Sequence, residues 1–544
     1  MNWLERLPLS ALFSVSFSLL GVATGSIAAP ASVEQGRDIY LRGMLPSGDP
    51  VRAHRPGLGE VSGREAACVN CHGRSGLGSA EGRTVMPPIT GSYLFRPRAT
   101  NIEHLDLRHA SGYSASLEPY NDATLAAAIT TGASRTGGAG SILSPVMPRY
   151  AMSAADVAAL TGYLKQLSSE PSPGVSADTL HFATIIAPGV PAAQRAAYVQ
   201  VLERFFRDKN AGTRHEVRRS AAAAEVMFKT YRRWALQVWE LEGHPQSWQD
   251  QLDRQYARAP VFAVIGGIST GTWEPVHAFC RTQAVPCVFP SVDAPAAMDA
   301  DFYSLYFSKG VVLEAEVMAR HLRERQAAGS LPQRIVQVRR DDVVATLAAR
   351  TLVHALAGSG LDFDERVIAS GQQVRTSLDG LTASDLVVLW LREDDTARLE
   401  VPPAVSSIYL SGTLTGDASA AMPAVLRERA RLIYPFSPPA ERARSLQLQA
   451  WLRAKGIPLI DERIQGQALF AASAVSEAAG HLLDNFLRDY LVERLEMMVG
   501  KMRFTAMYPR LGIGSGQRFG SKGAYVAGWG EDGRLRLDSE WIVP

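Results

Sequence analysis

The chain has 544 residues, of which 46% are hydrophobic and 20% are charged, and its formal net charge is +2. This length is too great for one domain and indicates roughly three or four units of about 150 residues each. The composition is that of an ordinary globular protein, and a nearly balanced charge without a basic run argues against binding to nucleic acid.

The N-terminus has the features of an export signal. Arg6 ends a short polar start, an apolar run extends from Leu7 to Ala23, and small residues follow. This order predicts a signal peptide over residues 1–31, cleaved after Ala28 or Ala31, and therefore a periplasmic protein. A retained membrane anchor is the alternative, but the run is short for a span. No later segment is apolar enough to span, so we expect no membrane association after cleavage.

The first predicted element after the signal is a helix from Val33 to Met44, in which Ile39, Tyr40 and Met44 share one face. Residues 45–66 are rich in Gly and Pro and show no period, so they are predicted to form a surface loop.

The next motif is Cys68-Val69-Asn70-Cys71-His72, which has the C-x-x-C-H spacing of a c-type haem attachment site. Two thiols at this spacing each add to a vinyl group on one edge of the porphyrin, and the histidine ligates the iron. A redox-active cysteine pair and half of a zinc site are the alternatives. Zinc needs further soft ligands, and the other cysteines, Cys280 and Cys287, lie far along the chain. We therefore predict one covalent haem c.

The sixth ligand of the iron must come from another segment. The candidates are Met86, His104, His109, Met147 and Met152. We choose Met147, which lies on a proline-flanked loop just before a predicted helix over 154–167 that Ser153 caps. Met86 is the main alternative, although loop packing is the default interpretation for it, and the two histidines lie in a polar, surface-like stretch. Ligation by His72 and Met147 raises the reduction potential and fills both axial positions, which favours electron transfer over catalysis.

This order of elements resembles a class I cytochrome c. The resemblance rests on the helix containing Gly36 and Tyr40, the haem motif, and a methionine before a C-terminal helix. It implies an all-α cytochrome domain over residues 32–168, in which a small residue at Gly36 lets the first and last helices cross closely. The segment between the two axial ligands is longer than in the smallest members, and residues 132–140 account for part of this length.

A semi-extended Ser/Pro linker at 169–177 precedes a region in which strands alternate with helices. Strands are predicted at 181–186, 234–239, 261–267, 285–289, 303–307, 335–338, 386–391, 407–410 and 432–435. Helices are predicted at 191–208, 271–282, 311–326, 341–357, 423–431, 439–454 and 474–498, and a final hairpin at 523–538. The alternation indicates parallel sheets covered by helices, and the number of strands indicates two lobes.

Two stretches, Val261–Thr272 and Val285–Asp293, resemble the first lobe of type I periplasmic binding proteins, of which the branched-chain amino-acid receptors are the best known. In that family a strand ends in glycine, a loop of small hydroxyl residues opens a helix, and prolines mark the next strand. The resemblance covers roughly 178–544. It implies a first lobe of about 178–300 and 437–500, and a second lobe of about 301–436 and 501–544.

The same resemblance implies a ligand cleft. Ser269, Thr270 and Gly271 are placed at the start of a helix, where backbone N–H groups favour a carboxylate, and Ser291 and Asp293 are placed beside them. In the family such positions hold the carboxylate and ammonium of the ligand, so a small amino-acid-like or carboxylate ligand is implied. Helix capping and loop solvation are the ordinary alternatives for these residues.

Cys280 falls late in a predicted helix and Cys287 in the strand that follows. A short turn brings them together in an oxidising compartment, so we predict a disulfide, with two buried thiols as the alternative.

The sequence thus predicts a periplasmic electron carrier with one His/Met haem and a domain that binds a small ligand or docks a redox partner. An exported dehydrogenase or another cytochrome is the expected partner. The alternative is a solute receptor of an ABC importer or sensor, with haem as a redox input. We expect no enzyme, because no Ser-His-Asp set, metal-ligand cluster or paired carboxylates are evident, and the glycines at 512, 514 and 516 precede no helix.

Overall fold

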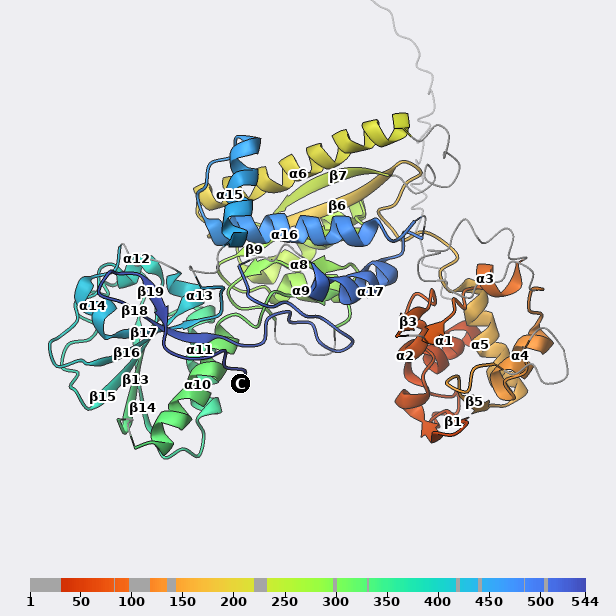
Figure 1. The fold of residues 1–544 in the computed structure, drawn as a ribbon, viewed down its shortest axis with the longest axis horizontal. Helices are drawn as coiled ribbons and strands as arrows, with labels where there is room; N and C mark the ends of the chain where they lie inside the picture. Colours follow the sequence, from red (N-terminus) through yellow and green to blue (C-terminus); the bar gives the residue numbers. More distant parts are fainter. Residues whose placement is uncertain are drawn as a thin grey trace, which may run out of the picture.

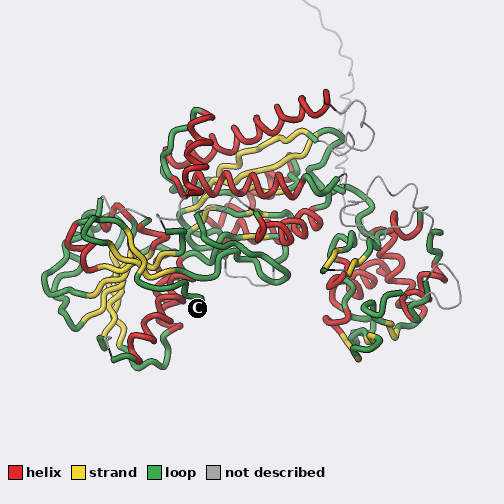
Figure 2. Tube along the Cα trace, viewed as in Figure 1, coloured by secondary structure: helices red, strands yellow, loops and turns green. Residues whose placement is uncertain are grey.

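The computed structural model describes residues 31–82, 84–96, 118–134, 143–219, 232–296, 301–329, 332–416, 421–438, 443–483, 485–502 and 507–544. Three bodies lie in a row, an N-terminal domain followed by two α/β lobes (Figures 1 and 2). The predicted signal peptide, apart from its last residue, and the candidates His104 and His109 lie outside the described residues. Within the described part of the chain, no helix is both long and apolar enough to cross a membrane.

The N-terminal domain is mainly helical, with two small antiparallel sheets. Its helices are α1 (Ala31–Arg42), α2 (Val69–His72), α3 (Gly91–Phe95), α4 (Asp122–Thr130) and α5 (Ala154–Gln166). One sheet contains β1 (Arg52–Arg55), β2 (Gly59–Ser62) and β5 (Arg149–Ala151), and the other is the hairpin of β3 (Ser79–Glu81) and β4 (Thr84–Met86). The predicted cap of α5 at Ser153 is present and forms a capping box, in which Ser153 and Asp156 each bond the backbone N–H of the other.

The crossing of α1 and α5 depends on a residue without a side chain. A Cβ atom at Gly36 would lie 2.1 Å from the carbonyl oxygen of Ala159 and 2.8 Å from Cβ of Tyr163. One turn further along α1, the ring of Tyr40 packs against that of Tyr163 with centroids 5.3 Å apart. The expected close approach of the first and last helices is therefore confirmed.

The first lobe is built on a parallel sheet. Its strands are β6 (Thr179–Ile186), β7 (Arg233–Glu240), β8 (Ala263–Ile265), β9 (Ile268–Ser269), β10 (Cys287–Val288), β11 (Ser291–Val292) and β12 (Ser304–Leu305). The order is β11-β9-β6-β8-β10-β12, with β7 also paired to β6. The helices of this lobe are α6 (Ala192–Arg219), α8 (Trp248–Arg258), α9 (Glu274–Thr282), α15 (Ala443–Lys455), α16 (Glu462–Ala479) and α17 (Arg488–Met498).

The second lobe has a mixed sheet in the order β14-β13-β15-β16-β17-β18-β19. The first five strands are parallel: β13 (Arg334–Arg340), β14 (Asp362–Ile368), β15 (Asp385–Trp390), β16 (Ser407–Ser411) and β17 (Ala430–Tyr434). The predicted hairpin, β18 (Tyr525–Trp529) and β19 (Leu535–Leu537), extends it antiparallel. The helices are α10 (Val311–Ala327), α11 (Val343–Ala355), α12 (Glu393–Thr396), α13 (Gly412–Thr415) and α14 (Ala424–Arg429).

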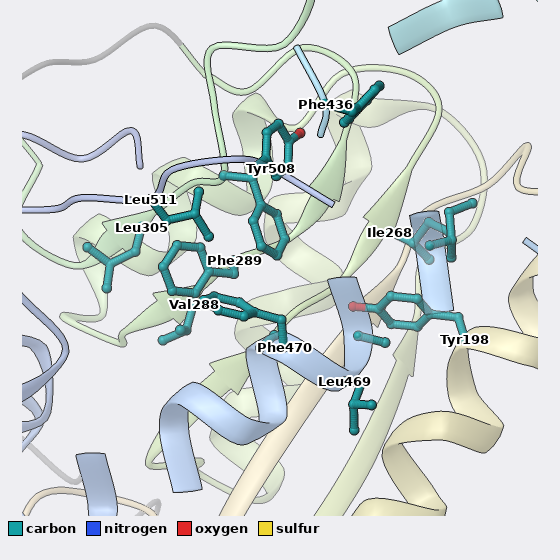
Figure 3. Packing of buried hydrophobic residues seen from close by; sticks show 14 of the residues in the cluster. Tyr198, Ile268, Val288, Phe289, Leu305, Phe436, Leu469, Phe470, Tyr508 and Leu511 are labelled. Atoms are coloured by element: carbon teal, nitrogen blue, oxygen red, sulfur yellow. The ribbon is translucent and has the colours of Figure 1, made fainter. Parts of the chain in front are cut away.

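Aromatic packing joins the segments that cross between the lobes. Tyr508, on the last crossing, packs on Phe307 with ring centroids 5.5 Å apart and on Phe436 at 5.2 Å. Figure 3 shows Tyr508 and Phe436 beside Phe289 and Phe470, which belong to the core of the first lobe. The crossings are therefore part of a continuous core.

Several sequence predictions differ from the structure. Residues 45–66, predicted to form a surface loop, contain β1 and β2, so the domain predicted as all-α also carries small sheets. The helix predicted over 474–498 is wrong, because α16 ends at Ala479 and α17 begins only at Arg488. The apolar residues Leu482 and Phe486 maintain a helical spacing but lie in the turn between the two helices. The first sheet also includes β12, some residues beyond the predicted limit of the first lobe.

Replacing Gly36 by Ala should destabilise the N-terminal domain by about 1–3 kcal/mol, because the added methyl group meets backbone of α5. Gly162→Ala is the matched control in the same helix pair, since nothing lies within 4 Å of a Cβ at this position. The control should be neutral or stabilising by roughly 0.5–1 kcal/mol, as expected for alanine in a helix. Chemical denaturation followed by circular dichroism measures both, and an unchanged stability of Gly36→Ala would contradict the close crossing.

Candidate functional site: the haem cavity and the interlobe cleft

The N-terminal domain contains an apolar cavity of about 280 Å³. Its wall includes Cys68, Cys71 and His72 of the C-x-x-C-H motif and Met147 from the loop before β5. The remaining lining is mostly apolar, with Leu94, Leu125, Ile129, Leu160 and Leu164 among its members. The motif and the predicted methionine therefore face one common space.

The orientation of His72 is fixed by the backbone. Its Nδ1 atom lies 2.9 Å from the carbonyl oxygen of Pro87, a bond that requires a proton on Nδ1 and leaves Nε2 available for a metal. The ring is buried, and this burial lowers the pKa of His72, so the imidazole is neutral at pH 7. A neutral ring with one nitrogen held by a carbonyl is the form in which histidine ligates iron.

The two motif cysteines have reduced thiols in the structure, in contrast to the other two cysteines. Burial raises the pKa of Cys68 to about 11, so this thiol is uncharged in the cavity wall. Tyr150 stands next to the motif and donates a hydrogen bond to the carbonyl oxygen of Ala66 at 2.9 Å. Two thiols, one oriented imidazole and apolar walls fit a haem held by Cys68, Cys71 and His72.

The structure separates the methionine candidates by position. Met152 is partly buried and packs against the core of the domain, whereas Met86 and Met147 both line the cavity. Met86 directly precedes Pro87, whose carbonyl oxygen holds Nδ1 of His72. Met147 lines the same cavity from a separate loop, and its role as the sixth ligand stays a prediction.

The two predicted cleft serines are hydrogen-bonded to other residues of the first lobe. The Ser269 Oγ atom accepts a hydrogen bond from the N–H of Gly271 at 3.1 Å and donates to the carbonyl oxygen of Thr272 at 3.2 Å. The helix that follows, α9, begins at Glu274, so Gly271 is not at its N-terminus as the sequence predicted. Ser291 bonds the side chain of Gln467. The ordinary explanation, local capping and loop bonding, therefore accounts for the serines.

Asp293 is buried and is paired with two arginines. Arg392, at the end of β15 in the second lobe, donates to Asp293 Oδ2 at 2.8 Å and to the carbonyl oxygen of Thr270 at 2.7 Å. Arg463 of α16 donates to Asp293 Oδ1 at 3.4 Å and to the carbonyl oxygen of Thr413 in the second lobe at 3.3 Å. These bonds join the two lobes across the cleft.

Sequence reasoning did not identify either arginine. Arg392 directly follows the buried strand predicted at 386–391, and the end of a parallel strand is where cleft residues lie, so a signal was present. Arg463 has no such signal, because it sits in the first turn of an ordinary helix.

The predicted disulfide is present between Cys280, in α9, and Cys287, in β10. It closes the turn that connects these two elements.

The comparisons agree with both halves of this description. The family model for cytochrome c matches residues 61–168, so this part of the chain is a cytochrome c domain, which implies covalent haem c. No curated protein matches the chain.

The α/β region has the fold of known binding proteins. A branched-chain amino-acid ABC transporter protein from Thermus thermophilus, solved with bound valine, is 13% identical with a TM-score of 0.51 and covers 68% of this chain and 98% of its own. A fatty acid ABC transporter substrate-binding protein from Thermomonospora curvata is 14% identical, with a TM-score of 0.50. The match covers 69% of this chain and 95% of that protein. A possible leucine/isoleucine/valine-binding protein from Rhodopirellula baltica is 12% identical, with a TM-score of 0.50. The match covers 68% of this chain and 98% of that protein. Identities this low establish the fold alone.

Replacing Met147 by Ala should abolish the weak far-red charge-transfer band of a methionine–iron bond in the oxidised protein. Met86→Ala is the matched control and should leave the band in place, because Met86 lines the same cavity but directly precedes Pro87, the residue that holds His72. Ultraviolet–visible spectra of both variants, expressed with haem maturation, measure this. Survival of the band in Met147→Ala would show that another residue is the sixth ligand.

Proposed function

We propose that this chain, a cytochrome c domain followed by a domain with a binding-protein fold, is a periplasmic electron carrier with one haem. The observation that supports it is the apolar cavity whose lining includes Cys68, Cys71, His72 and Met147. Two thiols and two axial side chains in one cavity match the ligand set of an electron-transfer haem.

The side chains of this site divide the work of holding such a group. Cys68 and Cys71 would supply the thioether links, and His72 and Met147 would ligate the iron. The bond from His72 to the carbonyl oxygen of Pro87 keeps the imidazole from rotating. A bound haem supplies one reversible electron per chain. The apolar residues around the cavity exclude water, and a thioether ligand favours the ferrous state, so the reduction potential is high relative to bis-histidine ligation.

We expect the redox partner to be another exported protein, either a dehydrogenase or a second cytochrome. Contacts of this kind are small and transient. The predicted N-terminal signal sequence and the disulfide between Cys280 and Cys287 support a periplasmic site.

A second candidate function is a solute receptor or sensor, and the binding-protein fold favours it. The ligand would then bind between the lobes near Ser269, Thr270, Gly271, Ser291 and Asp293. Against an amino-acid ligand stands the pairing of Asp293, the residue proposed for the ammonium, with Arg392 and Arg463.

The electron-carrier function is tested with carbon monoxide and a reduced c-type cytochrome as the electron donor. Stopped-flow mixing should show rapid, complete transfer of one electron per chain to the oxidised protein. The reduced protein should not bind carbon monoxide, because both axial positions are filled, whereas reduced Met147→Ala should bind it. Ready binding of carbon monoxide by the wild type would contradict the proposal and favour sensing at the iron.

Branched-chain amino acids should leave the melting temperature of the wild type unchanged, because the carboxylate of Asp293 is already paired. A ligand at about one hundred times its dissociation constant would stabilise the protein by about 2.7 kcal/mol, which a melting curve detects easily. Arg392→Ala frees one carboxylate oxygen and should permit such stabilisation. Arg375→Ala is the control, since it breaks an exposed pair with Glu400 that does not involve Asp293. A large shift in the wild type would favour the receptor.

A further inference from the structure

The loop that follows the haem motif is held by the second domain. Glu493, on α17 of the first lobe, accepts hydrogen bonds from the N–H of Ser75 at 2.9 Å and from its hydroxyl at 2.6 Å. The carbonyl oxygen of Ser75 in turn accepts a bond from Ser168 at the start of the linker at 2.6 Å. Every hydrogen-bonding group of Ser75 is therefore engaged.

The carboxylate of Glu493 also lies against the residue next to His72. A Cβ atom at Gly73 would be 2.7 Å from Oε1 of Glu493, and Gly73 has a positive φ of 72°. Only glycine permits this approach without strain. The side chain thus reaches the backbone one residue beyond the predicted proximal ligand.

Neighbouring contacts extend the same interface. The guanidinium of Arg74 lies 4.6 Å from the ring centroid of Phe302 and its Nε atom is 3.9 Å from Asp489 of α17. Asp489 also accepts a hydrogen bond from the hydroxyl of Tyr303 at 2.7 Å. In Figure 1, α2 and β3 occupy the side of the N-terminal domain that faces α17.

Helix α17 is itself anchored to the linker and to the first lobe. Arg488, its first residue, donates to the carbonyl oxygens of Val261 at 2.6 Å and Pro173 at 3.2 Å. Its backbone N–H bonds the hydroxyl of Ser172 at 3.0 Å. The linker is therefore packed against the first lobe. The start of α17 is held in place by the same contacts, and this helix carries Glu493 to the loop after the haem motif.

We infer that Glu493 is a positioning residue for the haem, which fixes the loop after His72 and couples the reduction potential to pH across the interface between the domains. This inference rests on the proposed electron-carrier function. Glu493 acts through Gly73 and Ser75 rather than by touching the iron.

The electrostatic surroundings support the coupling. Burial raises the pKa of Glu493 to about 7, although the hydrogen bonds from Ser75 oppose the rise. The charged and titratable groups that face it come from several elements: Asp489 and Arg494 of α17, Arg74 of the haem loop, Tyr40 of α1, and Tyr163 of α5 beyond them. Glu493 therefore changes charge near neutral pH.

The sign of the effect follows from charge. An ionised carboxylate near the haem stabilises the more positive ferric state, so the potential falls as pH rises through about 7. When a c-type cytochrome donor gives one electron to the haem domain, Glu493 takes up part of a proton from solvent. The raised pKa also means that the docked state favours the protonated form, so docking weakens as pH rises from the ordinary glutamate value through about 7.

The test is a spectroelectrochemical titration of the full-length haem protein between about pH 5 and about pH 9, which spans the ordinary and raised values of glutamate. The wild-type potential should fall across neutral pH. Glu493→Gln, which keeps the size but not the charge, should hold the potential near its low-pH value throughout. Glu496→Gln is the matched control, because Glu496 lies on the same helix but pairs with Arg518, and it should retain the wild-type profile.

Identical pH profiles for Glu493→Gln and wild type would overturn the inference. If Glu493→Gln does not fold, Ser75→Ala is the test in its place. Losing one hydrogen bond to the carboxylate should move the fall of the reduction potential to higher pH. If the potential of Ser75→Ala falls at the same pH as that of the wild type, the inference is overturned. The absence of any reversible one-electron couple in the wild type would instead overturn the proposed function, and the inference with it.

Discussion

The structure of the N-terminal domain is organised around one apolar cavity, whose lining brings the haem motif together with a methionine from a separate loop. The bond between Nδ1 of His72 and the carbonyl oxygen of Pro87 leaves Nε2 available for a metal. The loop before β5 contributes Met147, the predicted sixth ligand, to the lining of the same cavity. The helices around the cavity can then close on it only if α1 and α5 approach at Gly36, where no side chain intervenes.

The second domain makes two sets of contacts that its fold alone does not indicate. Across its own cleft, Arg392 and Arg463 join the lobes by pairing with Asp293. Across the boundary with the cytochrome domain, α17 holds the loop that follows the haem motif through Ser75. A domain with the fold of a solute receptor therefore has internal partners at the positions predicted for a ligand, and a contact beside the haem motif.

Local patterns allowed much of this structure to be predicted. Some features depend only on residues that are close in sequence. They are the haem motif, the capping box at Ser153 and the alternation of strands and helices. Gly36 could be interpreted because a known family uses a small residue there. The helix predicted over 474–498 failed because apolar spacing continues through Leu482 and Phe486, which are buried in a turn rather than on a helix face.

The contacts between distant segments could not be predicted. Glu493 and Ser75 are separated by 418 positions, and the sequence around either residue does not indicate the other as its partner. Arg463 meets Asp293 across 170 positions for the same reason. Such pairs depend on how whole domains pack, which a periodic pattern within one segment does not encode.

The central claim is that one covalent haem, held by Cys68 and Cys71, makes this chain a carrier of single electrons. The most direct measurement is the intact mass of the denatured protein after periplasmic expression with haem maturation. We expect the added mass of one haem in the wild type and in the double variant Cys280→Ser/Cys287→Ser. We expect no added mass in Cys68→Ser/Cys71→Ser. A wild-type chain without added mass, or with the mass of two haems, would contradict it.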